Sequence, residues 1–451
     1  VEEICREIKK VMPQIIIWIG GPEVSYDGVK VLERLPEVDG VMKGEGEQTF
    51  CDLLHFYQDK TVDGLQNMKG IVYREQTGQI VENEWRKTMD LSKVPFVYEN
   101  MELFEHKIIY YETSRGCPFS CSYCLSSIDK CLRFRDLELV KKELQFFIDH
   151  KVPQVKFVDR TFNCKHDHAM TVWRYIKEHD NGITNFHFEV AADLLNEEEM
   201  ELIKTMRPGL IQLEIGVQST NLDTIREIHR TMKFEQVAEV VRRINSYGNV
   251  HQHLDLIAGL PYEDYESFGK SFDDVYALEP EQLQLGFLKL LHGAAMREEP
   301  EEFPCVFSED PPYEVQKTPW LSPEELDVLR AAEDALERCY NSGRFLETAA
   351  YAMAAAGLSP FVFYCRLGAA GARHGTANIP LDDYTAFLYN WCAALPGIDK
   401  ACLRDAMVRD RLATNSTGRL PQCLHVTDAL LGRAVKRLAQ NPATAPLPGV
   451  R

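Results

Sequence analysis

The chain has 451 residues and carries 50 basic against 69 acidic side chains, a formal net charge of −19 at pH 7. This length exceeds what one hydrophobic core usually holds, so two or three domains are expected. The negative charge repels phosphate backbones and anionic lipid headgroups, which makes nucleic acid and membrane surfaces poor default partners. No apolar run reaches the ~20 residues of a membrane-spanning helix, and no signal-peptide pattern is present, so we expect a cytoplasmic protein.

Residues 1–68 are predicted to form half of a doubly wound, Rossmann-like α/β domain. A helix that ends before Pro13 is followed by an apolar strand over 15–19, and a second strand over 38–42 precedes another helix. A complete domain of this kind has about 100–150 residues. We therefore expect the strands that should precede these residues to be missing, which implies an N-terminally truncated chain.

The middle of the chain alternates strands with helices. A hairpin and linker over 69–106 lead into a region over 107–291, in which helical stretches separate nearly all of six predicted strands. Such alternation predicts a parallel sheet, here a partial (β/α)6 barrel of the TIM type, with functional residues in the loops after the strands. The six predicted strands are 108–112, 155–158, 186–190, 211–217, 253–257 and 283–288.

The C-terminal part is predicted to be mainly helical. From residue 292 onward the strand patterns stop, and the region 292–440 contains helical stretches such as 323–341 and 384–394. The last segment, 441–451, has three prolines in eleven residues and is predicted to be disordered.

Three closely spaced cysteines carry the strongest functional signal. Cys117, Cys121 and Cys124 follow the first predicted barrel strand, with three and then two residues between them. Thiolates bind iron-sulfur clusters, and a cubane cluster has four irons, so three protein ligands leave one iron open for a further ligand. The alternative is a structural zinc site with Cys131 or His150 as fourth ligand, although neither lies in the usual paired spacing.

With Tyr123 before the last cysteine, this segment resembles the signature of the radical S-adenosylmethionine (SAM) superfamily, over about 108–291. The resemblance implies a [4Fe–4S] cluster whose open iron is chelated by the amino and carboxylate groups of SAM. Electron transfer then splits the sulfonium and yields a 5'-deoxyadenosyl radical that abstracts hydrogen. It also implies an oxygen-sensitive enzyme with an electron donor such as flavodoxin or ferredoxin.

Further positions match the family less closely. The family usually has a Gly-Gly-Glu-like turn after the second barrel strand, and here Asp159 and Arg160 begin a different sequence, although Asp159 could still accept a hydrogen bond from the ammonium of SAM. Each acidic residue taken singly is nearly as compatible with a buried ion pair. The positions that the resemblance assigns to cofactor binding are Phe119, Tyr123, Asp159, Arg160, Glu189, Glu214, Gln218 and Asp255.

Gly20 and Gly21, together with the sequence Gly-Glu-Gly-Glu over 44–47, resemble the cobalamin-binding domain found in a subgroup of radical SAM proteins. Glycines at a strand end let the nucleotide tail of that cofactor pass close to the backbone. The family's Asp-x-His-x-x-Gly element would lie in the missing half, so the mode of cobalamin binding stays open. The C-terminal region is similar to a helical domain of unassigned function that often follows this pair of domains.

Three functions therefore compete. The first is a radical SAM enzyme that transfers a methyl group with the help of cobalamin. The second keeps the radical step without functional cobalamin and leads to rearrangement, ring formation or sulfur insertion. The third, from another class, is a metal-stabilised interaction protein. The sequence names neither the substrate nor the oligomeric state.

Overall fold

A computed structural model describes residues 1–59, 64–128, 130–415 and 419–425 of the chain. The tail predicted over 441–451 lies outside the described residues. The chain divides into two compact units, which we describe separately. The first unit comprises Val1–Asn100, Thr113–Leu139 and Leu290–Phe303, and the second comprises Met101–Glu112, Val140–Lys289 and Pro304–Arg451.

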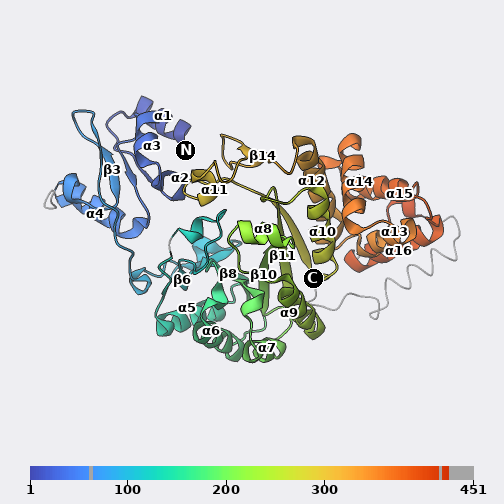
Figure 1. The fold of residues 1–451 in the computed structure, drawn as a ribbon. Helices are drawn as coiled ribbons and strands as arrows, with labels where there is room; N and C mark the ends of the chain where they lie inside the picture. The colour runs from blue at the N-terminus through green and yellow to red at the C-terminus, as the bar shows by residue number, and fades with distance from the viewer. Residues whose placement is uncertain (60–63, 129, 416–418, 426–451) are drawn as a thin grey trace. The chain divides into compact units, whose positions relative to one another are not determined.

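The first unit contains a four-stranded sheet in the order β1-β2-β3-β4 (Figure 1). Its first two strands are parallel and the others antiparallel, so the hairpin predicted after residue 68 extends this sheet. The strands are β1 (Trp18–Gly20), β2 (Gly40–Met42), β3 (Ile71–Arg74) and β4 (Ile80–Glu82). The helices are α1 (Glu2–Val11), α2 (Pro22–Ser25), α3 (Gly28–Arg34) and α4 (Gly46–Asp59).

Helices cover both faces of this sheet, as a doubly wound architecture requires. Successive residues of a strand point to opposite faces. Val72 packs with Leu32 of α3 on one face, and its neighbours Ile71 and Tyr73 pack with Leu53 of α4 on the other. The predicted α/β half-domain therefore has two small cores.

The first strand is shorter than predicted. It begins at Trp18 rather than at residue 15, because the Ile15 amide turns back to donate to the Met12 carbonyl oxygen (3.1 Å). Ile16 consequently stays 50% exposed. The apolar run is continuous in sequence, but only its last part reaches the sheet.

The second unit is built on a six-stranded parallel sheet with the order β12-β11-β10-β9-β8-β5. Each of the six predicted strands is present. Strands of this sheet that follow one another along the chain also lie next to one another in the sheet, as in an open barrel. The bounds are β5 (Ile109–Tyr111), β8 (Gln154–Phe157), β9 (Asn185–Val190), β10 (Ile211–Gln218), β11 (His251–Ala258) and β12 (Gln282–Phe287).

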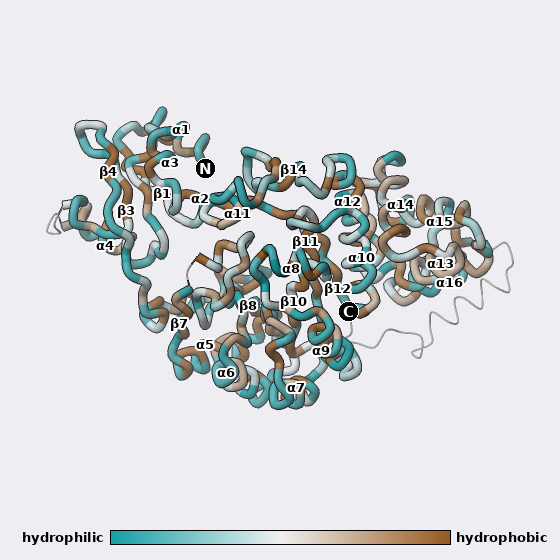
Figure 2. The backbone as a smooth tube through the Cα atoms, in the orientation of Figure 1, coloured by the Kyte–Doolittle hydropathy of each residue, from teal (hydrophilic) through white to brown (hydrophobic). Residues whose placement is uncertain are grey.

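One face of this sheet is apolar and the other is polar. Along β10, Ile211, Leu213 and Ile215 are buried, while the intervening Gln212 and Glu214 are partly accessible. Figure 1 shows helices α5, α6, α7 and α9 along one side of the sheet, and Figure 2 shows mostly hydrophilic residues on the turns of α6, α7 and α9 that lie away from the sheet. The helices are α5 (Leu137–Asp149), α6 (His166–Glu178), α7 (Glu197–Lys204), α8 (Leu222–Glu227), α9 (Phe234–Tyr247) and α10 (Tyr265–Tyr276).

The C-terminal part of the second unit is mainly helical, as predicted, but the expectation that strands stop at residue 292 is wrong. A short hairpin, β13 (Val306–Phe307) and β14 (Val315–Lys317), precedes the helices. Strands of two or three residues show no periodicity in a sequence, which explains the omission. The helices are α12 (Pro323–Leu336), α13 (Leu346–Ala356), α14 (Pro360–His374), α15 (Leu381–Cys392) and α16 (Lys400–Thr414).

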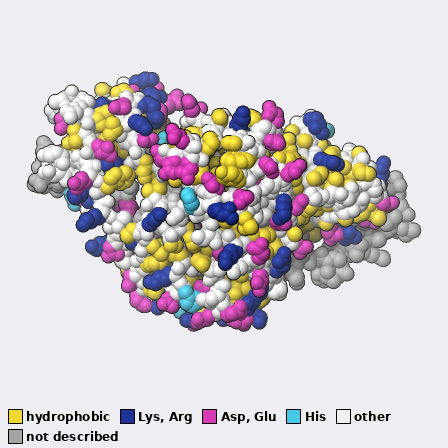
Figure 3. Space-filling view, viewed as in Figure 1, with side chains coloured by type: hydrophobic (Ala, Val, Ile, Leu, Met, Phe, Trp, Pro, Cys, Tyr) yellow, Lys and Arg dark blue, Asp and Glu magenta, His cyan; other side chains and the backbone are white. Residues whose placement is uncertain are grey.

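Within the described residues, no single helix has both the length and the apolar composition to cross a membrane. One pair of helices, α13 and α14, meets the length and composition test only when taken together, across a bend of 107°. On the face drawn in Figure 3, Lys and Arg side chains lie interspersed with Asp and Glu side chains.

Candidate functional site

The three cysteines lie in a loop that a short β-ladder closes at its base. Strand β6 (Ser114–Arg115) pairs antiparallel with β7 (Arg133–Phe134), so the residues between them, described over 116–128 and 130–132, form a loop on a two-stranded neck. This loop belongs to the first unit, and in the sequence it follows β5 directly.

Local geometry turns the backbone sharply around the thiols. Gly116, directly before Cys117, has φ 92°, a conformation that a residue with a Cβ rarely adopts. The Cys124 amide donates to the Cys121 carbonyl oxygen (3.1 Å), and the Ser127 hydroxyl donates to the Cys124 carbonyl oxygen (2.6 Å). These contacts form a turn at Cys121–Cys124, so the backbone does not run extended between these two cysteines.

The thiols are shielded to different degrees. Cys117 and Cys121 are 8% and 7% exposed, while Cys124 is half-buried. Phe119 and Tyr123, predicted as cofactor contacts, are both partly accessible in the same loop. Three partly shielded sulfur donors in one short loop suit the thiolate ligation of an iron-sulfur cluster. The donor set therefore fits a cluster chemically.

The two glycine turns of the first unit lie side by side at the carboxyl ends of β1 and β2. Gly20 is in register with Met42, and the Gly44 amide donates to the Ser25 hydroxyl (3.1 Å), which in turn donates to the Gly21 carbonyl oxygen (2.8 Å). Gly21 has φ 105°, and a Cβ built there meets nothing within 4 Å. The surface above Gly21 is thus open, as the close approach of a cofactor to the backbone requires.

In the second unit, charged side chains line the polar face of the sheet. Lys156 of β8 donates to Glu214 of β10 (Nζ to Oε2, 2.9 Å), and His187 of β9 lies at ion-pair distance from the same oxygen (Nε2 to Oε2, 3.0 Å). Glu189, in register with Glu214, lies on β9 between these strands. Four charged or titratable side chains thus meet on three neighbouring strands.

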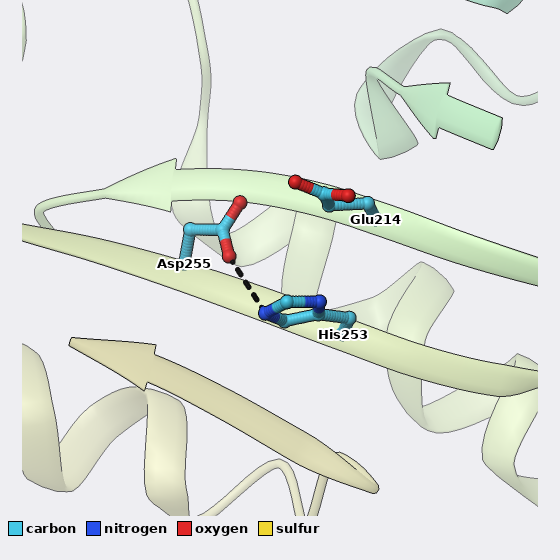
Figure 4. A group of neighbouring side chains, drawn as sticks. All are labelled: Glu214, His253 and Asp255. Carbon is cyan, nitrogen blue, oxygen red and sulfur yellow. Dashed lines mark ion pairs between the residues drawn. The ribbon is translucent and has the colours of Figure 1, made fainter. Parts of the chain in front are cut away.

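A second group continues this face onto β11. Figure 4 shows Glu214 on one strand beside His253 and Asp255 on the next, with an ion pair between His253 Nε2 and Asp255 Oδ1 (3.1 Å). One ligand atom from each of the three residues lies within 4.8 Å of the others, close enough to share a metal ion. However, the Lys156 ammonium already contacts Glu214 and would repel a dication there. The polar face therefore suits polar groups of a ligand better than a metal ion.

The environment separates the pKa values of these carboxyl groups. Burial, and then the charge of Glu214, raise the pKa of Glu189 to about 7. Burial acts on Glu214 in the same direction, but its contacts with His187 and Lys156 prevail and lower its pKa to about 2. Burial also raises the pKa of Asp255. One carboxylate is thus firmly ionised, while Glu189 can exchange a proton near neutral pH.

Several buried polar atoms on this face have no hydrogen bond. Among the described residues, Gln218 Oε1, His253 Nε2 and Asp255 Oδ1 are buried atoms without a hydrogen-bond partner, although the last two form the ion pair above. Gln218 has φ 71° at a bulge in β10. Unsatisfied buried polar atoms are costly, so their presence favours a ligand that completes them.

The structure brings Glu189, Glu214 and Asp255 together on one face. Glu214 and Asp255 lie within β10 and β11 rather than in the loops after these strands, where the sequence placed functional residues. Asp159 is fully buried directly after β8, whereas Arg160 is exposed. The prediction missed the basic members of the cluster, Lys156, His187 and His253. Alternation of polar and apolar residues in the predicted strands was the signal that could have found them.

The buried cysteines of the C-terminal helices form ordinary hydrogen-bonded or apolar contacts. Cys339 Sγ lies 3.4 Å from the Tyr384 hydroxyl, and burial raises the pKa of the Cys339 thiol to about 12. Burial likewise raises the pKa of Cys365, to about 11. Such thiols stay protonated at neutral pH, which does not favour the metal-binding thiolate form.

Comparison with known proteins bears on both units. The sequence model of the radical SAM superfamily matches residues 111–275, and a family described as "Protein of unknown function (DUF4080)" matches residues 301–446. The matched residues 111–275 include the three clustered cysteines and strands β8 to β11, so this part of the chain is similar to the radical SAM superfamily. This superfamily consists of enzymes that use a [4Fe–4S] cluster, SAM, a reductant and a substrate.

Similar proteins include methyltransferases. The chain is 25% identical over 293 residues to the "Uncharacterized methyltransferase PH0819" of Pyrococcus horikoshii, covering 61% of this chain and 62% of that protein. It is 25% identical over 288 residues to the cobalamin-dependent radical SAM methyltransferase TokK of Streptomyces tokunonensis, covering 59% of this chain and 41% of TokK. The chain therefore spans only about half the length of these relatives.

A solved structure shares the fold over nearly the whole chain. The cobalamin-dependent SAM radical enzyme OxsB, with aqua-cobalamin and SAM bound, matches with a TM-score of 0.58 and 16% identity. The match covers 97% of this chain and 72% of OxsB. At this identity the likeness shows the fold alone.

Proposed function

We propose that this chain is a radical SAM enzyme that transfers a methyl group to an unactivated carbon with the help of cobalamin. One observation carries the proposal: three cysteines with the superfamily spacing lie on a closed loop directly after the first strand of a six-stranded parallel sheet. TokK and the "Uncharacterized methyltransferase PH0819" support methyl transfer, because both are similar over about 60% of this chain.

The cysteine loop would hold the cluster. Cys117, Cys121 and Cys124 each offer one thiolate, so a fourth corner stays free for SAM. When bound, the cluster supplies the electron that splits the sulfonium of SAM. The partial burial of Cys117 and Cys121 would limit access of water and oxygen to the cluster.

The polar face of the sheet would hold SAM and polar groups of the substrate. Gln218 offers a buried oxygen without a hydrogen bond, and the Asp255 carboxylate, paired with His253, offers further acceptor capacity. Both suit the donors of an amino group or of ribose hydroxyls. Glu189 can accept a hydrogen bond when ionised and donate one when protonated, and its pKa of about 7 makes both forms available. Asp159, directly after β8, remains a proposed partner of the methionine ammonium.

Cobalamin would bind over the two glycine turns of the first unit. The open surface above Gly21 and the coupling of both turns through Ser25 support this placement. A chain in which these turns serve only as a scaffold would still perform the radical step. Hydrogen abstraction followed by rearrangement, ring formation or sulfur insertion is therefore the second candidate function. The cysteine loop has the same role in both candidates.

Anaerobic reconstitution with iron and sulfide separates the candidates. A brown protein that releases 5'-deoxyadenosine from SAM after reduction supports a radical enzyme, and retained cobalamin together with S-adenosylhomocysteine supports methyl transfer. Release of 5'-deoxyadenosine without S-adenosylhomocysteine would favour the second candidate. A colourless, stoichiometric zinc protein would instead indicate a metal-stabilised interaction protein.

We propose a cytoplasmic location and an electron donor of the flavodoxin or ferredoxin type. A cluster with an open iron and reduced thiol ligands needs a reducing compartment, and the cytosol keeps thiols reduced. Reduction of the reconstituted chain by purified flavodoxin tests the donor. Failure with flavodoxin and success with dithionite would point to another donor.

A further inference from the structure

Two arginines face each other at the neck of the cysteine loop. In the ladder between β6 and β7, Arg115 is the direct cross-strand partner of Arg133. Like charges directly opposite each other on an antiparallel pair destabilise it. A two-residue ladder has few backbone hydrogen bonds with which to offset that repulsion, so this neck needs a counter-charge.

Glu45 supplies the counter-charge to both arginines. Its Oε1 accepts hydrogen bonds from Nη1 of Arg115 (2.9 Å) and from Nη1 of Arg133 (2.7 Å), while its Oε2 accepts from the Met89 amide (2.8 Å). Glu47 accepts a further hydrogen bond from Nη2 of Arg115 (2.9 Å). All five residues belong to the first unit.

This network is shielded from solvent. The side chain of Glu45 is 19% exposed and that of Arg133 is 13% exposed. Although burial opposes it, hydrogen bonds from Met89, Arg133 and Arg115 lower the pKa of Glu45. Charge-assisted hydrogen bonds in such surroundings are roughly twice as strong as neutral ones.

We propose that Glu45 is a positioning residue for the cluster-binding loop: it neutralises the Arg115–Arg133 pair and thereby closes the neck that holds Cys117, Cys121 and Cys124. Arg115 lies two residues before Cys117, so opening of the neck displaces the first thiol directly. The inference rests on the proposed function of the loop, and it adds that residues of the N-terminal unit, remote in sequence, determine whether the cysteine loop can hold a cluster.

The test compares Glu45→Gln with the double variant Glu45→Gln/Arg133→Gln on the full chain. Glu45→Gln leaves two facing arginines without their shared carboxylate, so amide exchange in peptides covering 113–134 should accelerate roughly 10- to 100-fold before reconstitution. The double variant also removes one of the repelling charges, so its exchange should be slower than that of Glu45→Gln. If Glu45 acted only through packing or hydrogen bonds, amide exchange in the double variant would be as fast as in Glu45→Gln, or faster.

The chain offers a matched control on the surface of the same unit. Glu2 accepts hydrogen bonds from two arginines, Arg6 (3.3 Å) and Arg34 (2.8 Å), in the same one-carboxylate, two-arginine pattern. Glu2→Gln should leave exchange in 113–134 and the iron content unchanged. After anaerobic reconstitution, Glu45→Gln should bind less than half the iron of the wild type and give an altered electron paramagnetic resonance spectrum when reduced.

The outcomes separate the two proposals. The role of Glu45 is overturned if Glu45→Gln shows the wild-type exchange rate, or if exchange in the double variant is no slower than in Glu45→Gln. A wild-type chain with a protected neck that takes up no cluster overturns the proposed function, while the exchange data still decide the role of Glu45.

Discussion

Lys156 on β8 donates a hydrogen bond to Glu214 on β10, and thus spans the intervening strand β9 on the polar face of the sheet. The two side chains are 27% and 20% exposed. A pair of this kind is weakly screened by solvent, and removal of one partner leaves the other charge in a poor environment. The pair therefore links β8 to β10 across the polar face and also balances the charge of Glu214.

Replacement of Lys156 by Met should destabilise the protein by about 1–3 kcal/mol at pH 7, because Glu214 keeps its charge but loses the hydrogen bond and the charge of the Lys156 ammonium. The pKa of Glu214 lies below its usual value in the folded chain, so the Lys156 contribution exists above about pH 4.5 and is lost as the pH falls towards about 2. Urea denaturation at several pH values measures both effects.

The exposed pair Lys270–Asp274 on α10 is the matched control. Its nitrogen and oxygen lie 2.6 Å apart, yet the lysine side chain is 74% exposed. Lys270→Met should cost less than about 0.5 kcal/mol. Equal losses from Lys156→Met and Lys270→Met would contradict the importance that we assign to the half-buried Lys156–Glu214 pair.

Glu189 should make stability depend on pH near neutrality. Its pKa rises from about 4.5 to about 7 on folding, so the folded state binds the proton more tightly and stability falls as the pH increases from about 4.5 to about 7. Glu189→Gln should remove this loss. The difference in unfolding free energy between the variant and the wild type should therefore shift in favour of the variant by roughly 1–3 kcal/mol between pH 5 and pH 8. Thermal melting across that range is the measurement.

Glu263 provides the comparison for Glu189. It is fully buried, accepts hydrogen bonds from the hydroxyls of Ser219 (2.6 Å) and Ser271 (2.7 Å), and burial raises its pKa to about 7 as well. Both Glu→Gln variants should flatten the pH profile, but only Glu189→Gln should weaken SAM binding in calorimetry. Equal SAM affinity in the two variants would remove Glu189 from the cofactor site.

The cysteine assignment is tested by two substitutions in one loop. Cys121→Ala should abolish the cluster absorbance and SAM cleavage while melting remains cooperative, because the loop lies outside both hydrophobic cores of the first unit. Cys131→Ala, in the same loop and exposed, should retain about four irons per chain. Loss of metal from Cys131→Ala would instead indicate a four-ligand site that includes Cys131.

The strands and the cysteines of this fold were predictable, whereas the charge network was not. The barrel strands carry short apolar runs or alternate apolar with polar residues, and the spacing of Cys117, Cys121 and Cys124 is a local pattern. The contact of Lys156 with Glu214 depends on the register of three strands, which no local pattern contains. The neck between β6 and β7 escaped prediction because two-residue strands have no period.

The prediction for the N-terminal region also missed features that depend on tertiary structure. The apolar run before Gly20 correctly indicated a strand, but it did not show that Ile15 and Ile16 would stay outside the sheet. Likewise, Glu45 was noted only as part of a glycine-rich turn. Its contacts with Arg115 and Arg133 join positions 70 and 88 residues apart, and such pairs follow from tertiary structure alone.

Gly21 and Gly78 together test the proposed cobalamin surface. Both have positive φ, 105° and 87°, both lie in turns that follow strands of the same sheet, and a Cβ at either position meets nothing within 4 Å. Substitution by Ala should therefore introduce backbone strain of roughly 1–3 kcal/mol at either position, without a clash. Gly21→Ala, however, places a methyl group on the surface where we propose that cobalamin passes. The amount of cobalamin retained by this variant after gel filtration should therefore fall at least severalfold. Gly78→Ala should retain the wild-type amount. Urea denaturation of both variants measures the strain that each one carries. A loss of cobalamin in Gly21→Ala without a greater loss of stability than in Gly78→Ala reports on contact with the cofactor, and equal retention would favour the scaffold role of the glycine turns.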